Sequence, residues 1–136
     1  MAKVQRAVLW LAAVLTLAAC GAPSETPARL SEAAACGEAV FTAHCGSCHT
    51  VTSQESTTAP SLENVIGRTA GSTTFQYSPA MREANIVWTR QTLDQFLTAP
   101  RETVPGNQMA FFGMPDAAMR ADLIEYIAVH SQERAR

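Results

Sequence analysis

The chain has 136 residues, with 10 basic and 12 acidic side chains, and its formal net charge is −2 at pH 7. This length accommodates one small domain. Without residues 1–19 the chain keeps eight arginines, no lysine and all twelve acids, so its formal charge becomes −4. No basic stripe is then present to displace counterions from phosphates, and the composition argues against nucleic-acid binding.

The N-terminus predicts export. Lys3 and Arg6 precede an apolar run over residues 7–19, which is shorter than the roughly 20 residues that a transmembrane helix needs. This pattern is typical of a signal peptide. The run closes on Leu-Ala-Ala-Cys at Cys20, which resembles the lipobox of bacterial lipoproteins, in which the cysteine carries a lipid after cleavage.

We therefore expect residues 1–19 to be removed and Cys20 to be lipidated. The domain would then be exported and anchored to a bacterial membrane, in the periplasm or otherwise outside the cytoplasmic membrane. The alternative is an ordinary small-residue cleavage site that leaves Cys20 as a free thiol.

The rest of the chain divides into a tether and one domain. Residues 20–34 are rich in Pro, Ala, Ser and Glu, and we interpret them as the lipidated N-terminus and a flexible linker. Residues 35–136 are assigned to the domain. A first helix is predicted from about residue 32 to residue 44, with Ser31 as its cap.

The remaining pattern predicts an all-α fold with long loops, because no stretch alternates between apolar and polar residues. Long irregular loops in a compact domain usually have a function or need a ligand to order them. The expected elements, in chain order, are a polar loop over 50–58, a short helical turn over 61–67 closed by Gly67, a loop over 69–80, a helix capped by Thr89 and ended by Pro100, and a final helix over 116–132 with Pro115 in its first turn.

The residues that indicate chemistry are Cys45-Gly46-Ser47-Cys48-His49. On one helical turn, the sulfurs of Cys45 and Cys48 lie on the same side and the His49 imidazole falls beneath them. That arrangement suits two thioether bonds to a haem, with His49 as an axial ligand to its iron. In an exported chain this signal is specific.

Two other sites compete with this interpretation. A thioredoxin-like redox pair would use the same two cysteines, but it requires a preceding strand that the pattern does not predict. A structural zinc site could take Cys36, Cys45, Cys48 and His49, although Cys36 lacks the paired spacing of zinc ligands.

A six-coordinate haem needs a second axial ligand. Met119 falls in the apolar register of the final helix and is expected to pack in the core, and His130 is expected to be solvated near the helix end. Met109 is favoured, because it lies in a loop entered by Pro and Gly and left by two aromatics. The full set of candidates is Met81, Met109, Met114, Met119 and His130.

From Gly37 to about Gln132 the chain resembles the class I c-type cytochromes of the mitochondrial type, in a lipoprotein-anchored bacterial form. The family has a small all-α fold whose helices and long loops surround one covalently bound haem c. The pieces that carry the resemblance are GEAVFTAHCGSCHTV, APSLENVIGRTAG, FQYSPAM, IVWTRQTLDQFLTAP, VPGNQMAFFGM and RADLIEYI.

The resemblance assigns roles to individual residues. It implies that Met109 is the distal iron ligand, and that Gly37 and Phe41 in the first helix cross Leu123 and Tyr126 in the last. It also implies a set of haem contacts: Pro60 accepting a hydrogen bond from His49 through its carbonyl, Arg68, Tyr77 and Trp88 holding the inner propionate, and Phe111 beside the exposed haem edge.

The chain also departs from the family. Phe96 stands beside the haem where a tyrosine usually bonds the methionine sulfur, and Met81 replaces an asparagine that helps to order water. Both changes predict a drier distal side. The lysines used for docking are absent, and His44, Arg101 and Gln108 occupy corresponding places, so docking by a basic ring is in doubt.

The sequence thus predicts an electron carrier and not an enzyme, with no substrate pocket to propose. Its partners would be membrane redox complexes: a quinol-oxidising complex or a dehydrogenase as donor, and a terminal oxidase, a reductase or a photosynthetic centre as acceptor. The alternative is a haem peroxidase, or a gas or redox sensor, in which Met109 leaves the iron. Cys36 is left as an inert thiol or as one half of an intermolecular disulfide.

Overall fold

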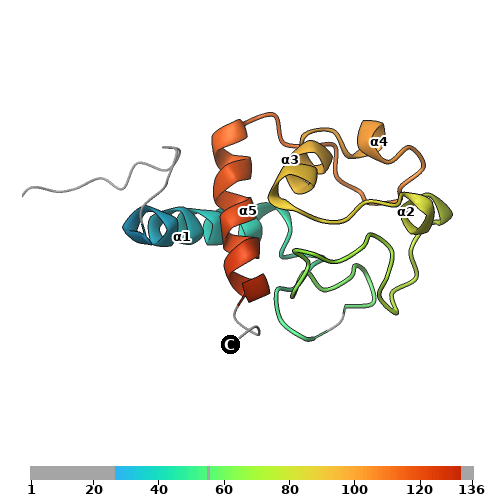
Figure 1. Ribbon diagram of the computed structural model, residues 1–136, viewed down its shortest axis with the longest axis horizontal. Helices are drawn as coiled ribbons and strands as arrows, with labels where there is room; N and C mark the ends of the chain where they lie inside the picture. Colours follow the sequence, from blue (N-terminus) through green and yellow to red (C-terminus); the bar gives the residue numbers. More distant parts are fainter. Residues whose placement is uncertain (1–26, 55, 133–136) are drawn as a thin grey trace, which may run out of the picture.

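A computed structural model describes residues 27–54 and 56–132 of the chain. In this part the helices are α1 (Pro27–His44), α2 (Pro79–Glu83), α3 (Arg90–Thr98), α4 (Pro100–Thr103) and α5 (Ala117–Gln132) (Figure 1). The described residues form no strand, and their one bridge pairs Thr69 with Val87. The all-α prediction is confirmed. No helix among these residues is long and apolar enough to cross a membrane. Residues 1–26, with Cys20 and the expected signal, lie outside the described residues.

The crossing of α1 and α5 organises the domain, with α3 packed beside α5 (Figure 1). A side chain at Gly37 would have no space, because a Cβ placed there would lie 2.6 Å from the Tyr126 Cβ and would also overlap the Asp122 carbonyl oxygen. The rings of Phe41 and Tyr126 fill the space beside this contact, with centroids 5.4 Å apart. The predicted crossing is confirmed. Glycine is needed here because it lets two helix backbones approach closely.

Gly37→Ala is therefore expected to lower the free energy of unfolding by about 3 kcal/mol, the upper end of the usual cost of overpacking a core. The added methyl group can be accommodated only if α1 and α5 separate. Denaturant unfolding of the holoprotein measures the effect, with Ala39→Gly on the exposed side of α1 as the control. The control should cost only about 1 kcal/mol, from helix propensity. Equal losses in the two variants would contradict the close crossing.

Asp122 gives this crossing a pH dependence. Burial raises the pKa of the Asp122 carboxyl, and the nearby Asp116 adds to the rise. A carboxyl whose pKa is higher in the folded than in the unfolded protein opposes folding once the pH exceeds its unfolded pKa. Asp122→Asn is therefore expected to raise the thermal unfolding midpoint at neutral pH, and the gain should vanish at acidic pH. A gain that persists below the ordinary pKa of aspartate would refute this account.

The core joins the helices to the loops. Its buried side chains come from α1, α3, α5 and the segments between them, and they are Phe41, Val65, Ala70, Trp88, Leu93, Phe96, Leu97, Val104, Met114, Leu123, Ile124, Tyr126 and Ile127. Met119 packs against this cluster as expected. His130 is half-buried rather than solvated, because its ring lies against Tyr126 and its Nδ1 bonds the Tyr126 carbonyl at 2.8 Å.

Several helix boundaries differ from the predictions. The first helix begins at Pro27 and runs through Ser31, so Ser31 is not its cap. Proline suits a first turn and the alanines that follow favour helix, which extends α1 into the predicted linker. Residues 61–67 form turns and no helix, although Gly67 has the predicted positive φ, at 84°.

Of two further predicted helix starts, one is confirmed and one is shifted. Thr89 caps α3 as predicted, through a reciprocal pair of bonds with Thr92. Pro115 lies before α5 rather than in its first turn, because the Asp116 carboxylate accepts from the Ala118 and Met119 amides and caps the helix instead. The sequence patterns predict no helix at α2, and the predicted loop over 69–80 includes its first two residues. Ser78 caps this helix and proline occupies its first position, a signal that was present in the sequence.

Candidate functional site

The residues from Cys45 to His49 continue the last turn of α1. The Cys45 amide donates to the Phe41 carbonyl at 2.8 Å, and the His49 amide donates to the Cys45 carbonyl at 2.9 Å. These bonds produce the single helical turn that the spacing predicts. Cys45 and Cys48 are both free thiols.

The thiols do not have the character of a redox pair. Burial raises the pKa of the Cys45 thiol to about 11, and Cys48 adds to the rise. A reactive dithiol needs the opposite, a pKa lowered toward neutrality. Nor do the described residues gather three or more His, Cys, Asp or Glu side chains that could hold a metal ion. Cys36 is half-buried in α1 and disulfide-bonded, so the interpretation of an inert free thiol is wrong.

The His49 ring is oriented by the loop that follows. Its Nδ1 lies 2.8 Å from the Pro60 carbonyl oxygen. A carbonyl can only accept, so Nδ1 carries the ring hydrogen and Nε2 keeps a free lone pair. Burial also lowers the pKa of His49, against the opposing effect of the Pro60 bond, and so favours the neutral ring. A neutral imidazole with its second nitrogen hydrogen-bonded is the form that binds a metal.

Arg68 and Trp88 lie on paired segments. The Trp88 amide donates to the Arg68 carbonyl at 2.9 Å, and Trp88 is buried with its ring centroid 5.1 Å from that of Phe96. The Arg68 guanidinium donates to the carbonyls of Ser61 at 2.8 Å and Glu63 at 3.1 Å. Burial lowers its pKa, and Tyr77 partly opposes this.

The Tyr77 hydroxyl shares a 2.8 Å hydrogen bond with Thr73. Tyr77 also lies close enough to Arg68 to raise the pKa of its guanidinium, so the two side chains are neighbours. The structure brings Arg68 near both Tyr77 and Trp88. Their contact with a propionate stays a prediction.

Met109 lies on residues 104–116, which form neither helix nor strand and are called the Met109 segment here. Met109 and Phe111 are half-buried and pack against the core. Phe112 is 84% exposed, and the Arg101 guanidinium lies 4.9 Å from its ring centroid.

The other candidate ligands have different surroundings. Met114 is buried in the core and its amide bonds the Leu97 carbonyl at 2.8 Å. Met81 is half-buried in α2. Phe96 is buried and has no hydroxyl to offer a methionine sulfur, so the expectation that this bond is missing stands as a prediction.

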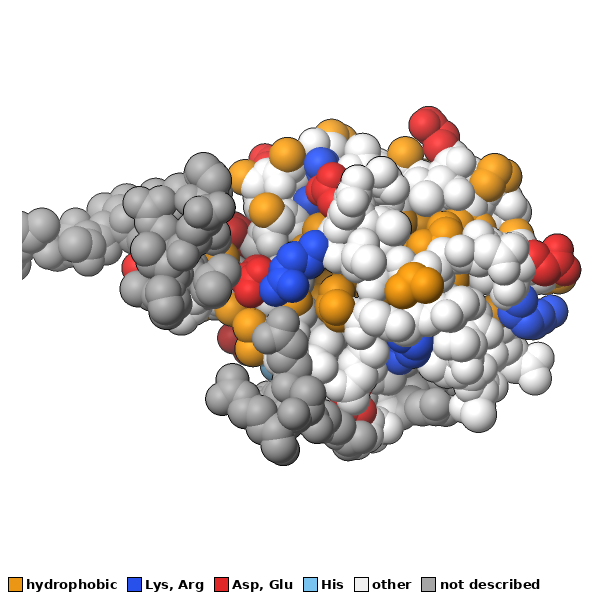
Figure 2. Space-filling view, viewed as in Figure 1, with side chains coloured by type: hydrophobic (Ala, Val, Ile, Leu, Met, Phe, Trp, Pro, Cys, Tyr) orange, Lys and Arg blue, Asp and Glu red, His pale blue; other side chains and the backbone are white. Residues whose placement is uncertain are grey.

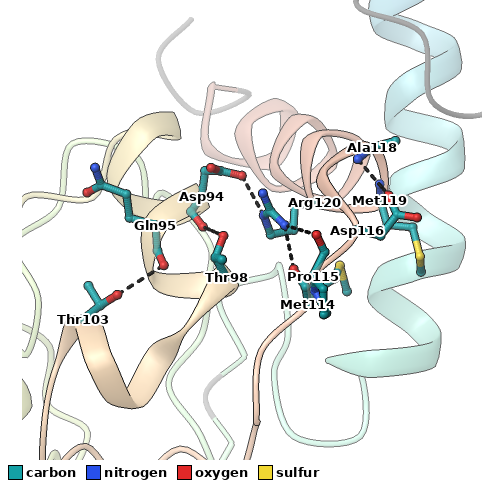
Figure 3. Close-up of polar contacts among 10 residues, drawn as sticks. All are labelled: Asp94, Gln95, Thr98, Thr103, Met114, Pro115, Asp116, Ala118, Met119 and Arg120. Atoms are coloured by element: carbon teal, nitrogen blue, oxygen red, sulfur yellow. Dashed lines mark hydrogen bonds and ion pairs between the residues drawn. The ribbon is translucent and has the colours of Figure 1, made fainter.

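Sequence reasoning missed two residues that hold the Met109 segment. Asn107 bonds the Met109 amide through Oδ1 at 3.1 Å. The Arg120 guanidinium donates to the Met114 carbonyl at 2.7 Å and the Pro115 carbonyl at 2.9 Å, and its Nε donates to the Asp94 carboxylate at 2.7 Å (Figure 3). An asparagine in a Pro-Gly-Asn turn is a signal for the first, because asparagine bonds backbone two residues on. Local sequence contains no signal for the second.

This set of residues fits a covalently bound haem. Two free thiols and an imidazole lie on one turn, the imidazole has a free lone pair, and Cys45 packs against the hydrophobic core. The class defined by fold and site is a small helical protein with a thioether-linked haem.

The comparisons with known proteins agree. The model of the family described as Cytochrome c matches residues 34–131. The chain is 44% identical over 96 residues to cytochrome c 2.1 of Caenorhabditis elegans, which covers 70% of this chain and 86% of that protein. It is 40% identical over 102 residues to the cytochrome c-type cyt cy of Rhodobacter capsulatus, covering 74% of this chain and 51% of that one.

Among solved structures, cytochrome cH from Methylobacterium extorquens matches with a TM-score of 0.66 and 32% identity, over 71% of this chain and 97% of that chain. The chain therefore belongs to the cytochrome c family. Its members bind one covalent haem c and transfer electrons, and they are not enzymes.

Proposed function

We propose that this chain is a monohaem, His/Met-ligated electron carrier tethered by lipid outside a bacterial cytoplasmic membrane. Cys45 and Cys48 would form the thioethers, and His49 and Met109 would be the axial ligands. The observation that carries this assignment is the 2.8 Å contact between His49 Nδ1 and the Pro60 carbonyl, which leaves Nε2 available. The haem supplies the one-electron change of its iron.

The protein's contribution is to bind, orient and shield. Pro60 fixes the ring of His49 and increases its basicity as a ligand. Buried Trp88 and Phe96 keep water from the interior. Arg68, which uses two guanidinium donors on backbone carbonyls, keeps further donors for a propionate near Tyr77 and Trp88. A buried carboxylate needs such donors, because burial alone would drive it to take up a proton.

The proposed partners are membrane redox complexes. A quinol-oxidising complex or a dehydrogenase would reduce this protein, and a terminal oxidase, a reductase or a photosynthetic centre would oxidise it. The support is the N-terminal sequence, in which an apolar run closes on Cys20 and a Pro/Ser/Glu-rich stretch follows. Such a tether would keep the domain close to complexes in the same membrane.

Docking would rely little on positive charge. Residues 20–136 contain no lysine, and on the face shown in Figure 2 the basic side chains lie apart from one another. A weak dependence of electron-transfer rates on ionic strength follows from this, because steering by charge is what salt screens.

The test of the carrier function is reoxidation by membranes of the source bacterium. Dithionite-free reduced protein, mixed with those membranes under air, should be reoxidised, and an inhibitor of the terminal oxidase should stop the reaction. Peroxidase activity is measured on the same protein, with hydrogen peroxide as the oxidant and a dye as the reducing substrate. If the membranes do not reoxidise the protein and it turns over peroxide rapidly, the assignment as an electron carrier is wrong and the protein is a peroxidase.

Anchoring is tested separately through Cys20. The wild-type protein should sediment with membranes, and its N-terminal peptide should carry the mass of a lipid on Cys20. Cys20→Ser should be recovered in the soluble fraction. A wild-type peptide without lipid, whether its Cys20 thiol is free or joined to Cys36, would refute the anchor and leave the redox assignment intact.

A further inference from the structure

The Met109 segment has no regular secondary structure to fix it, so its position depends on bonds from other residues. Side chains hold it at both ends. Asn107 acts close to its start, and Arg120, from the first half of α5, acts close to its end. Met109 lies between these two anchors.

Asn107 joins the segment to Pro100, the first residue of α4. Its Nδ2 donates to the carbonyls of Pro100 and Val104, each at 2.8 Å, while its Oδ1 accepts from the Met109 amide. One half-buried side chain therefore connects three backbone positions, and one of them is the methionine itself.

Arg120 joins the segment to α3 and α5 (Figure 3). Its side chain is 9% exposed, and it divides its donors between the Asp94 carboxylate and the carbonyls of Met114 and Pro115. Without it, two carbonyls would lose their donor, one of them in a buried bond. An unsatisfied buried carbonyl costs free energy, which the segment can recover only by moving outward to water.

We propose that Asn107 and Arg120 are positioning residues for Met109: they hold the Met109 segment against α3, α4 and α5, and so set how readily an external ligand displaces the methionine from iron. The proposal rests on Met109 being the axial ligand. Removing either anchor lowers the cost of moving the segment, while the four residues that bind the haem covalently or axially stay unchanged.

The chain contains a matched control for Arg120. Arg90 and Glu125 form a second ion pair between α3 and α5, at 3.1 Å. Arg90 donates to both carboxylate oxygens of Glu125. Arg120, in contrast, donates to one carboxylate oxygen of Asp94 (Figure 3). Among the described residues the Arg90 side chain bonds Glu125 and no carbonyl of the Met109 segment, and it is 49% exposed. The two pairs thus join the same helices and differ in contact with the segment.

The experiment titrates the oxidised holoprotein with imidazole and follows the loss of the far-red iron–sulfur band. Arg120→Met and Asn107→Ala are expected to tighten imidazole binding by about tenfold or more. Arg90→Met should change it by less than about threefold, because an exposed ion pair contributes little. Arg120→Lys, which keeps the charge but not the planar fork, should lie between wild type and Arg120→Met.

Each variant is also unfolded by denaturant, so that imidazole affinity is compared only among folded proteins. A purely structural role would lower the unfolding midpoint without changing imidazole affinity. If Arg120→Met does not fold, Asn107→Ala carries the test, since it removes no buried charge. Imidazole affinities within about threefold of wild type in the folded variants would overturn the proposal. A wild-type protein with no far-red band would instead overturn the ligation of Met109.

Discussion

Replacing Cys45 and Cys48 together by serine is expected to abolish covalent haem attachment completely. A serine hydroxyl does not form the thioether, and these are the free thiols on the turn that carries His49. The measurement is haem staining of the purified chain on a denaturing gel, where only covalently bound haem remains. The fold should weaken as well, because a bound group that stabilises only the native state adds to its stability.

Ser47→Ala is the matched control for that experiment, because residue 47 lies between the two cysteines on the same exposed turn. It should keep full haem staining. Staining that survives in the double cysteine variant would show that the haem is attached elsewhere, and the site assigned to this turn would be wrong.

Met109→Ala is expected to remove the far-red iron–sulfur band and to lower the reduction potential by on the order of 100 mV, within the roughly 0.8 V that axial ligands span. Thioether sulfur favours the reduced iron, so its loss favours the oxidised form. The open position should then bind carbon monoxide when the iron is reduced. Absorption spectroscopy and a redox titration check the three effects together.

Met114→Ala separates ligation from packing. Met114 is buried in the core, and its truncation should cost about 2–5 kcal/mol of stability while leaving the far-red band in place. If Met114→Ala removes the band and Met109→Ala preserves it, the ligand assignment is reversed.

Local sequence was sufficient for the features that depend on spacing. The turn from Cys45 to His49, the Thr89 cap and the positive φ of Gly67 each depend on a few adjacent residues, and the structure has them. The Gly37 crossing depends on distant residues, and only the resemblance to a family predicted it. Its physical basis, a backbone contact that excludes even a methyl group, is visible only in the structure.

The features that sequence did not predict depend on contacts between distant residues or on competing local signals. Arg120 and Asp94 are 26 positions apart, and nothing near either residue indicates that a buried guanidinium will bond loop carbonyls. Pro115 and Asp116 both suit a helix start, and the bonds that the Asp116 carboxylate accepts make it the cap of α5, which begins at Ala117. His130 was assigned to solvent from its place near the chain end, whereas its packing on Tyr126 half-buries it.

The absorption spectrum of the purified, oxidised wild-type protein tests the central claim most directly. Ligation by His49 and Met109 predicts a low-spin spectrum with the weak far-red band of an iron–methionine bond, and a reduced form that resists carbon monoxide. A high-spin spectrum without that band, or rapid carbon monoxide binding by the reduced protein, would contradict the proposed electron carrier and favour a haem enzyme or sensor.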